Sequence, residues 1–222
     1  MLNRPHLCSL FHRFESSAER PSFAAPALLL LAALLALSTA CSPMTHLKIR
    51  DDYAKVDRTA TYRVHLVTAP LPKTQAHPAG DTNVGVLYSA MATRYVNQHR
   101  DFIVRKSSAQ ATATKAECGD KIEAVLWLRP ILGVKGGEVD VQLEGELRRC
   151  KGWVLIWSAG LRDTWPSNDD QLKELTKQYT AQFGAVATSH AGPAFRALRI
   201  LLDTLPRPKL VKEADIDEKI EL

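Results

Sequence analysis

The 222-residue sequence lacks the short motifs that identify common enzymes and metal-binding domains. It contains no Gly-x-Ser-x-Gly, which would present a catalytic serine on a sharp turn, and no His-Glu-x-x-His, which would bind zinc. The glycine-rich stretch GVKGG at 133–137 lacks the Gly-Lys-Ser/Thr of a phosphate-binding loop. None of the seven histidines has the spacing of a metal-ligand pair. We therefore expect no catalytic residue, no metal and no cofactor, and we predict that the protein is not an enzyme.

The chain also lacks a strong excess of either charge. Its 29 Lys and Arg residues stand against 24 Asp and Glu residues, and the two signs are interspersed. Nucleic-acid binding needs a concentrated basic face, so we expect no nucleic-acid partner. Four acids alternate along one segment, Glu138, Asp140, Glu144 and Glu146. We interpret them as the solvated face of a strand, with catalysis or calcium binding as the alternative.

Long hydrophobic runs are missing as well. The apolar segment at 23–37 holds about fifteen uncharged residues, fewer than the roughly twenty that a helix needs to span a bilayer. It follows a basic lead-in with Arg4, Arg13 and Arg20 and ends in small residues. This order is typical of a signal peptide, which we place at 1–40.

Cys41 follows the small residues directly. The stretch LSTAC at 37–41 resembles the bacterial lipobox, in which the cysteine thiol receives diacylglycerol and becomes the first residue of the mature chain. Ser38 stands where that motif prefers leucine. The resemblance implies lipidation of Cys41 with acyl chains such as palmitate, which anchor a protein stably in a membrane. The alternatives are a secreted protein and an uncleaved short anchor.

The residue after the cysteine bears on the membrane. Ser42 is not the aspartate that would suggest retention in the inner membrane. By resemblance to lipoproteins of two-membrane bacteria, we expect an outer-membrane protein that faces the periplasm. The inner membrane and the cell surface stay open as alternatives.

Cysteine is scarce, with four in the chain. Cys8 would leave with the signal peptide and Cys41 would carry lipid, so Cys118 and Cys150 remain as a pair in an oxidising compartment. They lie close to opposite each other if the chain folds into a hairpin about 134–136. A disulfide there would close a loop of about 33 residues and contribute about 3–4 kcal/mol. Two free thiols or a metal pair are the alternatives.

Hydrophobic periodicity predicts one α/β domain of the α+β type. Strands are expected around 60–66, 101–106, 122–129, 138–147 and 153–161, and helices at 83–98, from a capping box of Asn168 and Gln171 to Val186, and over 190–205 with Pro193 in its first turn. We therefore predict a mixed, mostly antiparallel sheet of about five strands with helices packed on it, in the order strand, helix, four strands, two helices. The domain occupies 59–206, between a lipid-anchored tether at 41–58 and a charged, extended or loosely docked tail at 207–222.

Strand alternation assigns the aromatic residues to faces. Trp153, Leu155 and Trp157 share the phase of the core in the last strand. Val125, Trp127, Val154 and Ile156 are expected on the opposite face. We expect a helix to cover them, because exposed patches of that size are rare on monomers; a docking surface is the alternative. Trp127 and Trp165 are our candidates for binding a partner, because indoles often dominate binding energy.

Three stretches carry a resemblance to a family: MATRYVNQHRDFIV, PAFRALRILLDTLPRPKL and the terminal DEKIEL. With them, the chain resembles an uncharacterised lipoprotein family of myxobacteria and leptospires, which has no assigned activity. The element order is distantly similar to the α/β domain of periplasmic assembly lipoproteins. These are the curli-secretion lipoprotein, the penicillin-binding-protein activators and the N-terminal domain of the Tol-system propeller protein. That likeness implies binding to protein partners and no catalytic machinery.

The sequence thus predicts a non-enzymatic envelope lipoprotein that binds a protein partner or assists assembly, through the Trp127 face, a sheet edge or the 207–222 tail. One alternative is a carrier of a small amphiphile, which requires an apolar cavity between sheet and helices. Another is an envelope hydrolase, which requires a cleft joining His65 or His190 to an acid.

Overall fold

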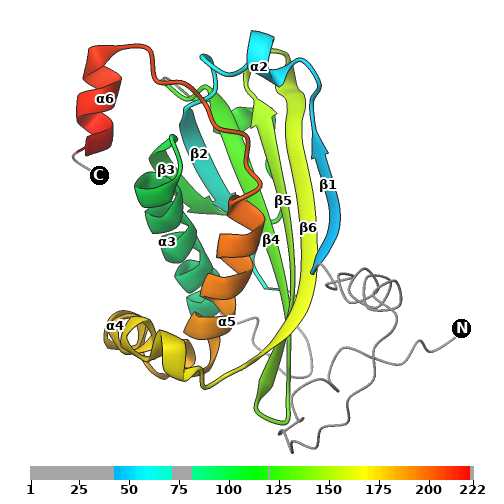
Figure 1. The fold of residues 1–222 in the computed structure, drawn as a ribbon, viewed down its shortest axis with the longest axis vertical. Coiled ribbons are helices and arrows are strands. Elements are labelled where there is room, and N and C mark those ends of the chain that lie inside the picture. Colours follow the sequence, from blue (N-terminus) through cyan, green and yellow to red (C-terminus); the bar gives the residue numbers. More distant parts are fainter. Residues whose placement is uncertain (1–42, 72–81, 120, 221–222) are drawn as a thin grey trace, which may run out of the picture. The chain divides into compact units, whose positions relative to one another are not determined.

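A single mixed sheet organises the computed structural model, which describes residues 43–71, 82–119 and 121–220 (Figure 1). The six strands lie in the order β1-β6-β5-β4-β2-β3. Their bounds are Met44–Ile49 (β1), Arg63–Thr68 (β2), Ile103–Ala109 (β3), Ala124–Lys135 (β4), Glu138–Arg149 (β5) and Val154–Pro166 (β6). β1, β6, β5 and β4 pair antiparallel, whereas β2 is parallel to both β4 and β3. The predicted α+β class and mixed sheet are confirmed.

The sheet has six strands instead of about five because of its first strand. Met44–Ile49 form β1, and Tyr53–Val56 form the short helix α2, within the segment expected as a tether. β1 lies at the sheet edge, and its main chain pairs with β6, as in Leu47 with Ala159. The compact unit begins at Pro43.

Helices cover one face of the sheet, which we call the inner face (Figure 1). α3 (Thr82–His99) and α5 (Ala185–Leu202) pack on the strands, and α4 (Lys173–Phe183) packs on α5. Three short 3₁₀ helices complete the chain order, η1 (Lys115–Glu117), η2 (Lys151–Trp153) and η3 (Asp170–Leu172), together with α6 (Glu213–Ile220). Among the described helices, none combines the length and the apolar character needed to cross a bilayer.

The boundaries of the two C-terminal helices differ from those predicted. Gly184 interrupts the helical conformation, because its φ of +77° favours glycine. α4 therefore ends at Phe183, and α5 begins at Ala185. Pro193 therefore lies inside α5 and not in its first turn. The predicted Asn168 cap is also wrong, because Asp169 accepts the hydrogen bond from Gln171 N, at 3.0 Å.

The central hairpin has the predicted register. Lys135 pairs with Glu138, and the two-residue turn between them is Gly136–Gly137, both with positive φ. Alternate residues of β4 and β5 then face the helices, as in the pairs Leu126 with Leu147 and Leu128 with Gly145. Trp157 of β6 is fully buried over Gly145, where an added Cβ would lie 2.7 Å from the indole ring.

The last strand departs from strict alternation. A β-bulge shifts the β5–β6 register between Leu147 and Arg148, so that Leu147 pairs with Trp157 while Arg148 pairs with Leu155. Because a bulge inserts one residue, it reverses which side chains face the core. Ile156 and Trp157 are both buried in the core, whereas Leu155 shares the opposite face with Arg148. The predictions that Leu155 lies in the core phase and that Ile156 lies outside are wrong.

The C-terminal segment forms a docked helix. Asp215 of α6 is buried, accepts a hydrogen bond of 2.6 Å from Tyr62 Oη and forms an ion pair with Arg63. Lys219 Nζ donates to main-chain oxygens at the end of α3 and the start of β3, among them that of Phe102. These contacts hold α6 near the β2–β3 side of the sheet (Figure 1).

Candidate functional site

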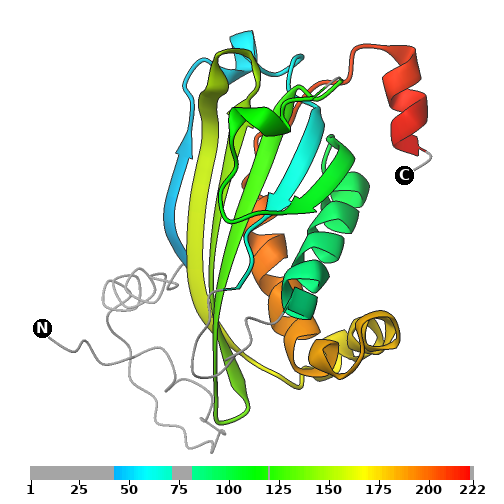
Figure 2. The ribbon, with the colours of Figure 1, turned by 180° about the vertical axis from the view of Figure 1, so that it is seen from behind.

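The face of the sheet opposite the helices, the outer face, is crossed by the connection between β3 and β4 (Figure 2). His65, Val67 and Val125 lie on this face and are buried. His65 Nδ1 donates to the main-chain oxygen of Glu117 at 3.2 Å, and its Nε2 accepts from Ser108 Oγ at 2.9 Å. The imidazole thus fastens the connection to the sheet. Part of the outer face is covered, as expected, but by this connection and not by an α-helix.

A disulfide fastens the same connection at the next residue, Cys118. Cys118, which follows η1, is bonded to Cys150 at the end of β5, with an S–S distance of 2.14 Å. This is the predicted pair. The connection is therefore held at two adjacent residues, Glu117 by His65 and Cys118 by Cys150.

Below the covered part, the outer face of β4, β5 and β6 carries paired charges. The predicted acidic row lies here, and three of its members form ion pairs: Glu144 with Arg129, Glu146 with Arg148 at 2.9 Å, and Asp140 with Arg162 at 2.9 Å. Arginines neutralise these carboxylates, two of them across strands and Glu146 within β5, so the row is a solvated set of ion pairs. Within the described residues, no three His, Cys, Asp or Glu side chains could hold a metal ion.

Trp127 lies at the border between the covered and the charged part. It is half-buried and lines a pocket of about 330 Å³ beside the β3–β4 connection. The lining residues are Thr112, Ala113, Trp127, Glu146, Arg148 and Trp153. The indole Nε1 is buried and has no hydrogen-bond partner among the described residues. A buried donor without an acceptor costs free energy.

Trp153 is the second tryptophan of this pocket. The prediction that it belongs to the core is wrong. Trp153 is the last residue of η2 and has a φ of +52°, a left-handed conformation that costs free energy for a non-glycine residue. The guanidinium of Arg148 lies over its ring at 5.7 Å from the centroid. The bulge in the β5–β6 register explains the error, because it reverses the faces at the start of β6.

Trp165, the other predicted partner-binding residue, lies on the inner face. It pairs with the buried Val139 and packs against the core beside the helices. The structure therefore does not bring Trp127 and Trp165 together. Cys41, the predicted lipidation site, lies outside the described residues.

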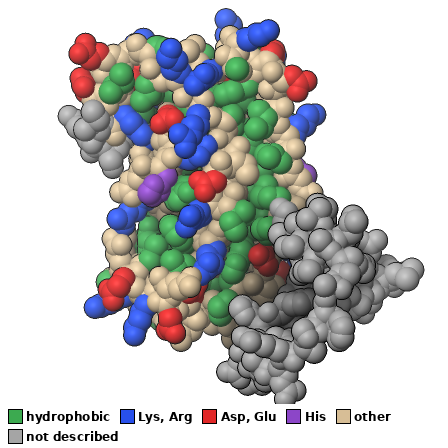
Figure 3. All heavy atoms as spheres, in the orientation of Figure 1, with side chains coloured by type: hydrophobic (Ala, Val, Ile, Leu, Met, Phe, Trp, Pro, Cys, Tyr) green, Lys and Arg blue, Asp and Glu red, His purple; other side chains and the backbone are tan. Residues whose placement is uncertain are grey.

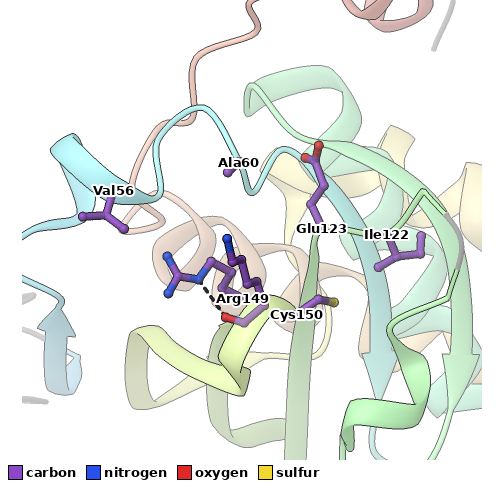
Figure 4. A pocket seen from close by; sticks show the side chains of 7 residues that line it. Val56, Ala60, Ile122, Glu123, Arg149 and Cys150 are labelled. Carbon is purple, nitrogen blue, oxygen red and sulfur yellow. Dashed lines mark hydrogen bonds between the residues drawn. The ribbon is translucent and has the colours of Figure 1, made fainter.

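A second pocket, of about 630 Å³, opens beside the disulfide at the end of β5 (Figure 4). Arg149 donates to Lys151 O at 2.9 Å and forms an ion pair with the buried Asp57. Glu123 Oε2 accepts from the main-chain nitrogens of Tyr62 and Arg63, each at 3.1 Å. The lining of this pocket contains no hydroxyl, imidazole or free thiol.

The two alternative functions each require a feature that can be compared with the described residues. A hydrolase needs a histidine beside an acid, but His65 contacts the main chain of Glu117, whose carboxylate accepts from Thr114. His190 is buried in α5. A carrier needs space between the sheet and the helices, where the structure places close-packed side chains such as Trp157 and Leu201. A pocket of about 210 Å³ lies instead among α3, α4 and α5.

The β3–β4 connection gives a testable pH dependence. Burial lowers the pKa of His65 below its ordinary value of 6.5. Below pH 6.5 the unfolded chain therefore binds more protons than the folded one, and stability should fall as the pH drops. We expect the free energy of unfolding to decrease more between pH 7.5 and 5 in the native protein than in His65→Gln. Equal decreases in urea titrations of the two proteins would contradict the role given to His65.

Comparison with known proteins gives solved structures of bacterial proteins. No protein-family model and no curated protein sequence matches the chain. A variant of the PelC dodecamer from Paraburkholderia phytofirmans is 13% identical, with a TM-score of 0.40 over 68% of this chain and 91% of that one. Protein CT253 from Chlamydia trachomatis is 11% identical, with a TM-score of 0.46 over 65% and 95%. Lipoprotein GNA1162 from Neisseria meningitidis is 12% identical, with a TM-score of 0.35 over 54% and 96%.

One of these similar structures is a lipoprotein. Their TM-scores are below 0.5, so they support no argument about function. The resemblance to a family of myxobacteria and leptospires stays a prediction, since no family model matches.

Proposed function

We propose that the chain is a non-enzymatic envelope lipoprotein, anchored through Cys41, that binds a protein partner on its outer sheet face around Trp127. The anchor is supported by the small residues before Cys41 and by a disulfide suited to an oxidising compartment. We place the protein at the outer membrane on its periplasmic side, because Ser42 follows the cysteine.

The observation that carries the binding site is the state of Trp127. Its ring borders a pocket, its buried Nε1 lacks an acceptor, and the neighbouring Trp153 is held in a costly backbone conformation. Strained residues and unsatisfied donors persist where function requires them. The pocket contains two tryptophans and an arginine, the residue types most enriched at the energetic centres of protein interfaces.

Crosslinking in intact cells, followed by mass spectrometry of the captured proteins, tests this site. We expect Trp127→Ala to reduce capture of the principal partner by about tenfold or more, because a central interface tryptophan commonly contributes 2 kcal/mol or more. The variant should fold, since Trp127 is half-buried and outside the main core.

Trp165→Ala serves as the matched control. Trp165 lies on the inner face, so its replacement should leave capture unchanged at equal protein level. Loss of capture in Trp165→Ala but not in Trp127→Ala would move the site to the inner face and contradict the proposal.

A further inference from the structure

The described part of the fold begins two residues after the proposed anchor. The main-chain oxygen of Pro43 accepts a hydrogen bond of 2.9 Å from Arg162 N, and β1 starts at Met44. Two residues of extended chain reach at most about 7 Å. If Cys41 carries lipid, as the proposed function holds, the sheet therefore has no tether of useful length and must lie at the membrane surface.

At the end of the sheet where β1 begins, β6 and the β4–β5 hairpin extend further than β1 does. Met44 pairs with Leu161, and β6 continues for five more residues to Pro166, which pairs with Glu138 at the β4–β5 turn. Five strand residues span about 17 Å. Cys41 lies at most about 10 Å from Met44 by the length of three residues.

The strands thus project further than the chain between Met44 and Cys41 can reach, and this limits how the domain can be oriented on the membrane. With strands perpendicular to the bilayer, the β4–β5 turn would lie about 7 Å or more deeper than the acylated cysteine. That turn carries the exposed charges of Lys135 and Glu138, and burying charge in a bilayer is costly. With the strands parallel to the bilayer and β1 against it, no charged turn has to enter.

The side chains of β1 suit such a contact. The side chains of Leu47 and Ile49 are 51% and 40% exposed. Both are on the inner face of the sheet, because they pair with Ala159 and Trp157, which face the core. We call these two residues the β1 rim. Figure 3 shows a band of hydrophobic side chains over this side of the sheet. Lys48, between them, is exposed on the other face, where an ammonium can meet lipid phosphate.

We propose that the β1 rim lies in the headgroup region of the phospholipid bilayer to which Cys41 is anchored. The domain then rests on the β1 edge, and the outer face with Trp127 stays accessible to a partner from the side. The contact also covers an edge strand, which would otherwise offer unpaired main-chain groups to other proteins.

Photolabelling from the lipid tests this orientation on the full lipidated protein. The protein is reconstituted in phosphatidylethanolamine and phosphatidylglycerol vesicles that contain a phospholipid with a diazirine near the headgroup, and labelled peptides are mapped by mass spectrometry. We expect residues 43–50 to carry about tenfold more label than the 134–138 turn or α6, in keeping with apolar side chains in contact with lipid.

Variants refine the test. Leu47→Asp with Ile49→Asp should lower labelling of 43–50 by about tenfold, because charged groups leave the interface. The matched control is Val211→Asp with Ile216→Asp. These side chains are 53% and 45% exposed and lie in or next to α6, near the β2–β3 side of the sheet and away from β1. This control should be labelled as the native protein is. The labelling pattern of the native protein decides the question even if the first variant fails to fold.

Labelling centred on 134–138, or no label on 43–50 in vesicle-bound protein, would overturn the inference while leaving the anchor intact. Failure of the anchor itself is seen separately, as a Cys41→Ser protein that still floats with the vesicles.

Discussion

Replacing Trp157 with alanine is expected to lower the free energy of unfolding by about 3–5 kcal/mol, the cost of removing a large buried aromatic side chain. Trp157 is fully buried, and its ring fills the space above Gly145. Its Nε1 donates to Thr204 Oγ1 at 3.1 Å, in the turn after α5. The substitution therefore leaves a cavity between β5, β6 and α5 and removes one hydrogen bond from Thr204 Oγ1, which still donates to Leu201 O. A urea titration measures the loss.

Trp153→Ala is the matched control for this prediction. It removes the same side chain four residues earlier, but from the outer face, where Trp153 is half-buried. We expect a loss of about 1 kcal/mol or less, as for residues outside a core. Equal losses at the two positions would contradict the bulge that separates them.

Replacing both Cys118 and Cys150 with serine is expected to lower the free energy of unfolding by about 3–4 kcal/mol, because the disulfide limits the entropy of the unfolded chain across a separation of 32 residues. Hydrogen exchange should also rise in residues 110–119, which the bond holds over the outer face. Thermal unfolding and exchange of the oxidised native protein provide the reference.

Reductant supplies the control for the disulfide. Treating the native protein should reproduce the loss of stability, whereas the double-serine variant should not respond. An unchanged unfolding curve for the reduced protein would show that the bond contributes nothing to the fold.

The hairpin could be predicted because local chemistry determines it. Two glycines can both adopt positive φ, and alternating residues on either side fix which face is buried. The same register placed Cys118 near Cys150. Each of these features depends on neighbours in sequence or on one turn.

The errors arise where contacts distant in sequence decide the structure. β1 is short and exposed, and it exists because its main chain pairs with β6, about 110 residues away. The bulge beside Leu147 leaves no signature in composition, yet it exchanged the positions of Trp153 and Ile156. Proline is favoured in the first turn of a helix, so the sequence predicts a helix that begins near Pro193. Packing on the sheet instead lets α5 begin at Ala185, with Pro193 in its interior.

The candidate site was predicted in part. Trp127 is on the expected face, since strand alternation determines it. The pocket beside it also needs Thr112 from an irregular connection and Trp153 from beyond the bulge, and neither position follows from periodicity. Trp165 has the same residue type but the opposite face, which its pairing with Val139 explains.

Detergent partitioning of the native protein and of Cys41→Ser, expressed at equal level in the producing cells, tests the central claim most directly. The account predicts that the native protein enters the detergent phase with a mass increase from acyl chains on Cys41, and that the serine variant stays in the aqueous phase. If the two proteins partition alike, or if Cys41 carries no lipid in the native protein, the proposed anchor and the orientation built on it are both wrong.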